Sequence, residues 1–384
     1  MRRELTILAR DPDLVVRGVL PYRSAEITLR WLYPGSWTLE LPATPRVLAA
    51  AQPGWGIIAH LDGVQILSGS IEDIEQEQTT DGGTVVLSGA DDLAIVAGEL
   101  AYPDPTRGAT SQTTVTHDAR SGAMETVVKG YVAANVGVGR HADRRDPAAP
   151  AVREVVVAPD LGRGAAVSYQ ARFDPLMDIV RAVAPTGGLG VTCGQQGQQL
   201  VFDAVEPRDL SAVARFSFQS RNLSSARWSV GMPEATHVVV AGGDEGTARV
   251  FRQRADSVTA QAWRLAYRVF RDQRHTSDTA ELDQAGDEVL ADATRSGIVE
   301  ARLVDTARLR FGVDYGLGDR VTVAPADDIE FTDLVTTAVV RADASSGEVT
   351  VVPSVGWADG PFDTRQDRQV WELARRISAL ERSQ

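Results

Sequence analysis

Short runs of alternating apolar and polar residues, separated by glycine-containing turns, occupy most of the first hundred residues. The run SWTLELP (36–42) places its apolar side chains on one face of a strand and its polar ones on the other. Asp62-Gly63 stands between two further runs, which predicts a two-residue β-hairpin turn. Gly82-Gly83 marks another reversal before a third run. Many short strands with regular turns are typical of a small barrel or sandwich.

The apolar spacing changes between residues 106 and 210. Residues 124–132 have apolar side chains at i, i+3, i+4, i+7 and i+8, which predicts an amphipathic helix. A second helix is predicted from FDPLMDIVRAVAPTGG, with Asp174 as its N-cap and Pro175 as its first residue. A hairpin is expected at residues 195–197. Residues 106–210 are therefore predicted to form a small α/β domain between β-rich parts.

Strand patterns return after residue 210 and are interrupted by one predicted helix, near 278–296, that opens at Asp278. The predicted fold is a β-rich α+β chain with two barrel-like modules and an inserted α/β domain. The first module is expected at 1–105, the inserted domain at 106–210, the second module at 211–360, and a C-terminal coiled-coil helix at 361–384.

The last twenty residues have the heptad spacing of a coiled coil. Apolar residues at intervals of 3, 4 and 3 form an a/d seam, and flanking charges are placed to pair between helices. β-Branched a positions with Leu at d favour two strands, but two heptads are marginal alone, so an already assembled oligomer would set the number of helices. The predicted interface residues are Val370, Leu373, Ile377, Leu380, Arg376 and Glu381.

Charge and cysteine content exclude several functions. The net charge is −13, and 38 of the 39 basic residues are arginine, the exception being Lys129. Without a basic cluster, the chain is not expected to wrap nucleic acid, although DNA could slide past it. A lone Cys193 excludes an internal disulfide and a cysteine-rich zinc site. Neither a signal peptide nor a run of ~18 apolar residues that could cross a membrane is expected.

The stretch VDYGLGDRVTVAP (313–325) could be a phosphate loop, a calcium loop or a turn that leads into a strand. No P-loop ending follows its glycines, and its aspartates lack the alternating spacing of a calcium loop. Residues 53–89 show a similar order of glycine pair, short strand, turn, long strand and closing strand. Gly54 and Gly56, and likewise Gly316 and Gly318, are therefore predicted to open two similar β modules.

Other candidate sites are weak. The histidines lack the spacing of a metal-binding motif. His117 and His141 lie in polar loops, and nothing in the sequence indicates that they come together as a hydrolytic zinc site. The stretch AGGDEGTAR (241–249) is expected to be a hairpin turn, and the Asp pairs at 91–92 and 327–328 are expected to be solvated. No catalytic, cofactor-binding or metal-binding residue is predicted, and the chain is not expected to be an enzyme.

Several segments together resemble the baseplate hub proteins of long-tailed phages, in particular the ReqiPepy-type minor tail proteins of actinobacterial siphophages. The resemblance spans about residues 1–357 and is carried by the order of its segments. They include DGVQILSGSIED, LSGADDLAIVAGELAYPDP, METVVKGYVAANVG, FSFQSRNLSSARWS and YGLGDRV followed by VVPSVG.

The resemblance implies a homotrimeric ring at the virion tail tip, in which two modules per chain form a pseudo-sixfold face. That face would dock the tail tube or distal tail protein, and the ring would surround the tape measure protein and the path of the DNA. A tail fibre or receptor-binding protein would attach nearby. Two alternatives stay open at this point: a cell-wall hydrolase within 106–210, and a host-binding adhesin.

Overall fold

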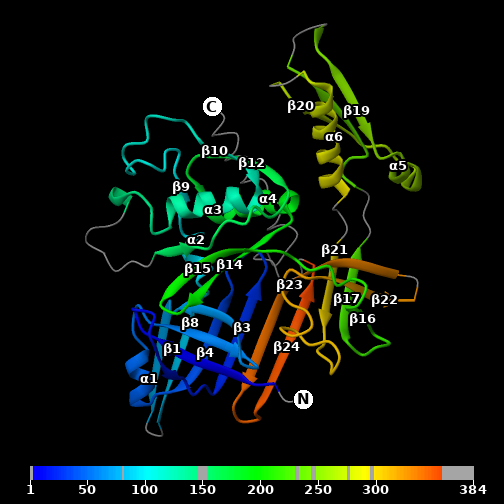
Figure 1. Cartoon of the computed structure of the whole chain (residues 1–384). Helices are drawn as coiled ribbons and strands as arrows, with labels where there is room; N and C mark the ends of the chain where they lie inside the picture. The colour runs from blue at the N-terminus through cyan, green and yellow to red at the C-terminus, as the bar shows by residue number, and fades with distance from the viewer. Residues whose placement is uncertain are drawn as a thin grey trace. The chain divides into compact units, whose positions relative to one another are not determined.

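The structure is a computed structural model that describes residues 3–79, 82–144, 154–229, 233–243, 248–274, 277–294, 298–327 and 329–356 (Figure 1). Contacts group the described residues through Ser225 with those from Ala301 onward into unit 1, and Ala226–Glu300 into unit 2. These two units are divided at other residues than the predicted domain boundaries at 105, 210 and 360. Those boundaries stay predictions. All six predicted coiled-coil residues lie outside the described part of the chain.

The chain begins with a four-stranded antiparallel sheet in the order β2-β1-β5-β6. Its strands are β1 (Leu5–Arg10), β2 (Val16–Val19), β5 (Gly56–Leu61) and β6 (Val64–Ser70), and α1 (Pro45–Ala50) precedes β5. The predicted hairpin at Asp62-Gly63 is confirmed, since both residues have positive φ (52° and 84°). Two successive positive φ values match the right-handed twist of the flanking strands.

A ten-stranded sheet forms the centre of unit 1. Its main path runs β17-β21-β24-β23-β3-β4-β8-β7, with β22 on β23 and β16 on β22. Its strands are β3 (Ser24–Arg30), β4 (Ser36–Pro42), β7 (Asp73–Thr79), β8 (Gly82–Ala90), β16 (Arg215–Ser217), β17 (Leu223–Ser229), β21 (Ile298–Leu303), β22 (Arg320–Ala326), β23 (Ile329–Asp343) and β24 (Glu348–Val355). Alternation is clear in β3 and β4, where every second side chain is buried in the core.

The similarity between residues 53–89 and 315–356 corresponds to a shared order of strand pairs. In the first segment β5 pairs with β6, the chain continues into β7, and β7 pairs with β8. In the second, β22 pairs with the first half of β23, and β24 pairs with the second half beyond a bulge after Val335. The consecutive strands β6 and β7 of the first segment therefore correspond to the two halves of the single long strand β23 in the second.

The segment between the two modules is an α/β insertion whose helices pack on short sheets. Its elements are α2 (Leu93–Ala97), β9 (Leu100–Ala101), β10 (Asp118–Ala123), α3 (Met124–Asn135), a 3-10 turn (Ala142–Arg144), β11 (Val155–Val157), β12 (Ala166–Ala171), β13 (Asp174–Pro175), α4 (Leu176–Gly187), β14 (Gly190–Gln196) and β15 (Gln199–Val205). The five predicted core positions of α3 are all buried. The predicted hairpin at 195–197 is confirmed, because β14 pairs with β15 around Gly197.

The predicted start of the second helix is wrong by one residue. Asp174 is not an N-cap, because Asp174 and Pro175 form β13 and pair with β9, and α4 begins at Leu176. The Asp174 carboxylate accepts a hydrogen bond from the backbone N of Arg172, which precedes it. Strand pairing with β9, which the local sequence does not show, overrides the capping pattern.

A buried charged cluster holds α3 against the insertion's sheet. Glu125 is fully buried and accepts hydrogen bonds from Lys129 Nζ (2.7 Å) and Arg163 Nη2 (2.8 Å). Lys129 Nζ also lies 2.7 Å from Asp203 Oδ1, and the Lys129 side chain is 4 % exposed. The hydrogen bonds from Arg163 hold the pKa of Glu125 far below its ordinary value of 4.5.

We expect Glu125→Gln to destabilise unit 1 by about 3 kcal/mol at neutral pH, because it leaves the buried Lys129 and the partly exposed Arg163 short of a carboxylate. Since the folded pKa of Glu125 is depressed, its contribution is present above pH 4.5 and is lost as the pH falls below that value. Urea unfolding at pH 7 and at pH 3.5 measures both effects. The wild type and Glu125→Gln should differ less at the lower pH, and an equal difference at both would contradict the role of this carboxylate.

Unit 2 is a small α/β sandwich of its own. Its sheet has the order β19-β18-β20, formed by β18 (His237–Ala241), β19 (Phe251–Ala255) and β20 (Arg268–Asp272). α6 (Thr279–Thr294) covers one face through Leu282 and Ala285, and α5 (Ser257–Trp263) follows β19. The predicted helix near 278–296 and hairpin around 241–249 are thereby confirmed, because β18 and β19 pair antiparallel across that stretch.

Candidate assembly surfaces and the junction behind them

The turn at residues 313–325 is a structural corner that leads into β22. Gly318 has φ of +79°, and the buried Asp319 accepts a hydrogen bond from the backbone N of Gly316 (2.8 Å). Asp319 also accepts from Arg208 Nε (3.0 Å), so its carboxylate fixes the chain where the α/β insertion returns to the sheet. These partners occupy both oxygens of the Asp319 carboxylate. The stretch is therefore a turn that leads into a strand, which is one of the three alternatives predicted for this sequence.

Trp31, just after β3, connects three parts of unit 1. Its side chain is 6 % exposed and belongs to the core of the α/β insertion. Its ring is flanked by Gly190 and Gly318, where an added Cβ would overlap the six-membered ring. The backbone N of Trp31 donates to Thr336 O in β23 (2.7 Å). The Gly318 predicted to open the second module is therefore required by contact with Trp31 as well as by its positive φ.

The first glycine pair has a related role. Gly54 has φ of +83°, and Gly56 begins β5 so close to Arg10 and to the Gly69 carbonyl that a side chain would not fit. Arg10 is completely buried and donates to Asp92 Oδ2 (2.7 Å) and Gln195 Oε1 (3.2 Å). This places β1, α2 and β14 around one ion pair, and so joins the first module to the insertion.

The expectation that the Asp pair at 91–92 is solvated is wrong. Asp92 is 1 % exposed and accepts from Ser68 Oγ (2.6 Å) as well as from Arg10. Asp91 accepts from the backbone N of Gly35 (2.7 Å), and burial raises the pKa of Asp91 to about 7. The partners lie far away in the sequence, so no local pattern could have shown the pairing. Asp328, of the second pair, lies outside the described residues.

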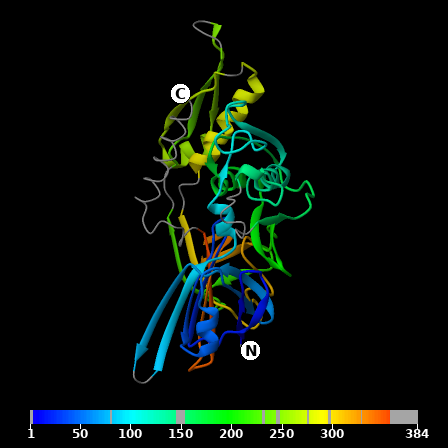
Figure 2. The same cartoon turned by 90° about the vertical axis from the view of Figure 1, so that its left-hand side faces the viewer.

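Among the residues that the structure describes, the main path of the ten-stranded sheet ends at two edge strands, β7 on one side and β17 on the other. β7 belongs to a ribbon with β8 that projects from the rest of unit 1 (Figure 2). Asp73, Glu75 and Glu77 lie on one face of β7, and all three side chains are exposed. Open edges of this length are templates for pairing with another strand.

The face of this sheet that turns away from the core is polar. The strand register places Glu75 and Glu40 in one row across this face, and Glu26 and Arg341 in the next row. Arg341 Nε lies 2.7 Å from Glu26 Oε2. The opposite face carries core residues that include Ile27, Leu39 and Leu87. A broad, largely acidic sheet face repels phosphate, which makes it a poor surface for binding nucleic acid.

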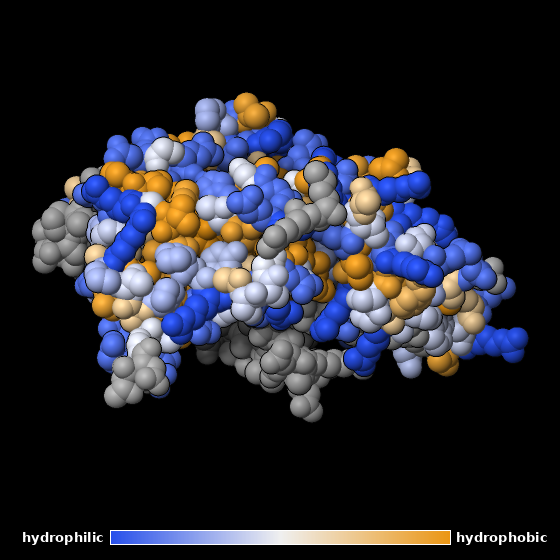
Figure 3. Space-filling view, turned by 90° about the horizontal axis from the view of Figure 1, so that it is seen from below, coloured by the Kyte–Doolittle hydropathy of each residue, from blue (hydrophilic) through white to orange (hydrophobic). Residues whose placement is uncertain are grey.

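Large apolar side chains also reach the surface. The face seen from below shows apolar groups between strongly hydrophilic ones (Figure 3). In unit 2, Phe251 and Phe270 are 56 % and 60 % exposed on the sheet face opposite α6. Clusters of this kind often mark contacts with other proteins.

The histidines that the structure describes, and Cys193, are not part of a catalytic arrangement. His60 and His237 lie in β5 and β18, and His141 Nδ1 accepts a hydrogen bond from Asp143 N in the same turn (3.2 Å). Cys193 is buried in β14, and burial raises the pKa of its thiol, which disfavours the reactive thiolate. Within the described ranges, no group of three or more His, Cys, Asp or Glu side chains could hold a metal ion, and no helix could span a membrane.

The sequence matches the Siphovirus ReqiPepy6 Gp37-like protein family over residues 4–356. The chain belongs to this family. The predicted resemblance is thereby confirmed, and the match covers both β modules, the α/β insertion and unit 2. Among curated proteins, no sequence matches the chain.

Solved structures of tail proteins share the fold. The 43 kDa tail protein of prophage MuSo2 from Shewanella oneidensis is 14 % identical with a TM-score of 0.57, and the match covers 92 % of this chain and 98 % of that one. A tail protein from Neisseria meningitidis MC58 is 14 % identical, with a TM-score of 0.55 and coverage of 92 % and 97 %. Prophage tail protein gp18 from Listeria monocytogenes EGD-e is 9 % identical, with a TM-score of 0.53 and coverage of 97 % and 99 %.

The prediction of a β-rich fold with a few helices, similar to that of phage tail proteins, is confirmed. The likeness in fold extends over nearly the full length of each of these three tail proteins.

Proposed function

We propose that the protein is a non-enzymatic baseplate hub that forms a homotrimeric ring at the tail tip of a siphovirus. The ring joins the tail tube or distal tail protein to the tip, holds the tape measure protein and a fibre or receptor-binding protein, and surrounds the path of the DNA. Family membership and the tail-protein fold support the tail as its location.

The observation that carries the ring is the order of strands in the ten-stranded sheet. The main path consists of two four-strand repeats, β17-β21-β24-β23 and β3-β4-β8-β7. In both repeats the four strands are neighbours in the same way: first, second, fourth and third in the order of the chain. Within the chain they are joined where β23 pairs antiparallel with β3. The strands left open at the two ends, β7 and β17, occupy the positions that β23 and β3 hold in their own repeats.

Pairing β7 of one copy with β17 of the next would therefore repeat a junction that the chain already contains. Three copies give six such repeats, and a sheet that continues from copy to copy closes without free edges. The acidic face would then line the inside of the ring, where DNA passes without sticking. The coiled-coil residues 370–381 would add a contact at the axis.

The repeat also predicts the register between copies. Matching Ser88 of β8 with Ser354 of β24, in the similar stretches VVLSG and VVPSVG, matches Glu77 with Arg341. Arg302 lies opposite Ser354, and Ser224 Oγ donates to Arg302 O (3.0 Å), so we place Ser224 in the position that Glu26 holds in the other repeat. Because Arg341 lies opposite Glu26, Glu77 should lie opposite Ser224 of the neighbouring copy.

A disulfide experiment tests this arrangement. Light scattering should show a trimer, and the Glu77→Cys/Ser224→Cys protein should form a disulfide-linked trimer on oxidation, since opposed strand positions bring Cβ atoms within about 5.5 Å. Glu75→Cys/Ser224→Cys, two residues out of register, is the matched control and should cross-link poorly. A monomer on assembled tails as well as in solution would overturn the ring. A trimer without the Glu77–Ser224 cross-link would keep the ring but reject the continuous sheet.

A further inference from the structure

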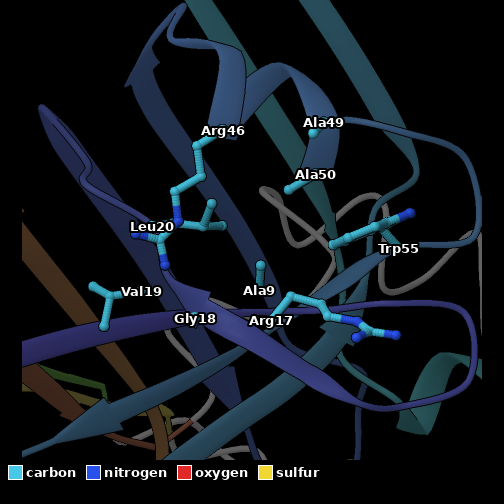
Figure 4. Close-up of a pocket in the computed structure, with 9 residues that line it drawn as sticks. All are labelled: Ala9, Arg17, Gly18, Val19, Leu20, Arg46, Ala49, Ala50 and Trp55. Carbon is cyan, nitrogen blue, oxygen red and sulfur yellow. The ribbon is translucent and has the colours of Figure 1, made fainter.

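A small apolar cavity of about 160 Å³ opens between α1 and the edge strand β2. Its floor is formed by the buried residues Ala9, Leu20 and Ala50. In Figure 4, Arg46 reaches from α1 toward Gly18 and Leu20 at one end of the cavity, while Trp55 and Arg17 lie at the other. The cavity therefore combines an apolar floor with cationic walls.

Two small residues make this space. Ala9 of β1 and Gly18 of β2 are paired across the sheet, and Gly18 has φ of +127°. An added Cβ on Gly18 would overlap the Arg46 guanidinium, so the absence of a side chain lets Arg46 lie across the strand. Arg46 is exposed and has no hydrogen-bond or ion-pair partner among the described residues, whereas Arg17 donates to Asp11 Oδ2 (2.6 Å).

The cavity adjoins an open strand edge. In the described sheet, β2 pairs on one side only, with β1. Because Leu20 N donates to Ile7 O (2.8 Å), the alternation of an antiparallel pair turns the backbone groups of Val19 outward, and the register shifts beyond Gly18, at Arg17. Val16 and Val19 are 47 % and 50 % exposed on this strand. An added strand would find backbone partners here, and its side chains on the α1 side would face the cavity.

We propose that this site binds an extended, acidic segment of a different protein as an additional strand on β2. Side chains two residues apart share a face of a strand, so an apolar residue fills the cavity and a carboxylate two positions away pairs with Arg46. The recognised pattern is apolar-x-acidic. The choice of a different protein as donor rests on the proposed ring, which uses the exposed acidic edge strand β7 of each copy. The cavity, Arg46 and the open edge of β2 are features of the single chain.

A display library of random heptapeptides, selected on the full chain, tests the proposal. The wild type should enrich apolar-x-acidic sequences. A synthetic peptide chosen from them should bind Arg46→Glu at least tenfold more weakly, and the same peptide with Lys in place of its acidic residue should regain binding to that variant. Arg271→Glu, an equal charge change at an exposed position of unit 2, is the matched control and should leave binding unchanged.

Backbone methylation separates strand addition from a simple charge contact. N-methyl groups on one alternate set of peptide residues should abolish binding, and those on the other set should be tolerated, because only one set faces β2. The proposal is overturned if no sequence pattern is enriched, if Arg46→Glu binds the acidic peptide as well as the wild type does, or if both methylated sets bind alike.

Discussion

Replacing Trp31 with alanine is expected to lower the free energy of unfolding by about 3–5 kcal/mol, the usual cost of removing a large buried aromatic side chain. The ring fits between Gly190 and Gly318, two backbone positions that have no side chain to move into the space it leaves. The cavity would therefore collapse poorly, which places the cost toward the upper end of this range.

Trp37 provides a matched control for Trp31. It is 2 % exposed in β4, within the first module, and donates its indole N–H to Ala90 O (3.3 Å). Trp37→Ala should destabilise by a similar amount, but only Trp31→Ala should also loosen the link between the sheet and the α/β insertion. Limited proteolysis of both variants at equal residual stability would show this difference as earlier release of a fragment from residues 91–210. Equal cleavage patterns would contradict the connecting role of Trp31.

Replacing Arg10 with methionine is expected to have a comparable effect, about 3–5 kcal/mol, because it leaves the buried Asp92 carboxylate without its cation. The methionine fills much of the volume of the arginine stem, so the loss reports charge and hydrogen bonds rather than a cavity. Chemical unfolding measures the difference, and the unfolding midpoint should fall without a change in slope.

Two further variants test the Arg10 prediction. Arg17→Met removes the cation of the Arg17–Asp11 pair, in which the Arg17 side chain is 55 % exposed, and should cost at most about 1 kcal/mol. Arg10→Met/Asp92→Leu removes both buried charges and should recover much of the stability that Arg10→Met loses. If the double variant is no more stable than the single one, the cost does not come from an uncompensated carboxylate.

We expect the stability and the assembly of this protein to depend on different parts of the fold. Trp31 and Arg10 hold the α/β insertion to the first module from inside the core, while β7, β17 and β2 expose edges to other chains. Variants of the edges should change assembly with little loss of stability, and variants of the junction should do the reverse. Measuring both quantities on each variant separates the two roles.

The sequence by itself determined the local elements with clear periodicity. The alternation in β4, the turn at Asp62-Gly63 and the stripe of α3 are each set by residues a few positions apart, so a local pattern is sufficient. The similarity of 53–89 to 315–356 was also visible in the sequence. Gly54 and Gly318 have positive φ, and at Gly56 and Gly318 other groups lie too close for a side chain, so glycine is needed at these three positions.

Only the tertiary structure decided how these elements join. The pairing of β23 with β3, the ion pair of Arg10 with Asp92 and the place of Trp31 between Gly190 and Gly318 link residues that are far apart in the chain. No local spacing encodes such contacts, since each depends on how separate elements pack. For the same reason Asp174 looked like a helix cap although it pairs as a strand, and Asp92 looked solvated although it is buried beside an arginine.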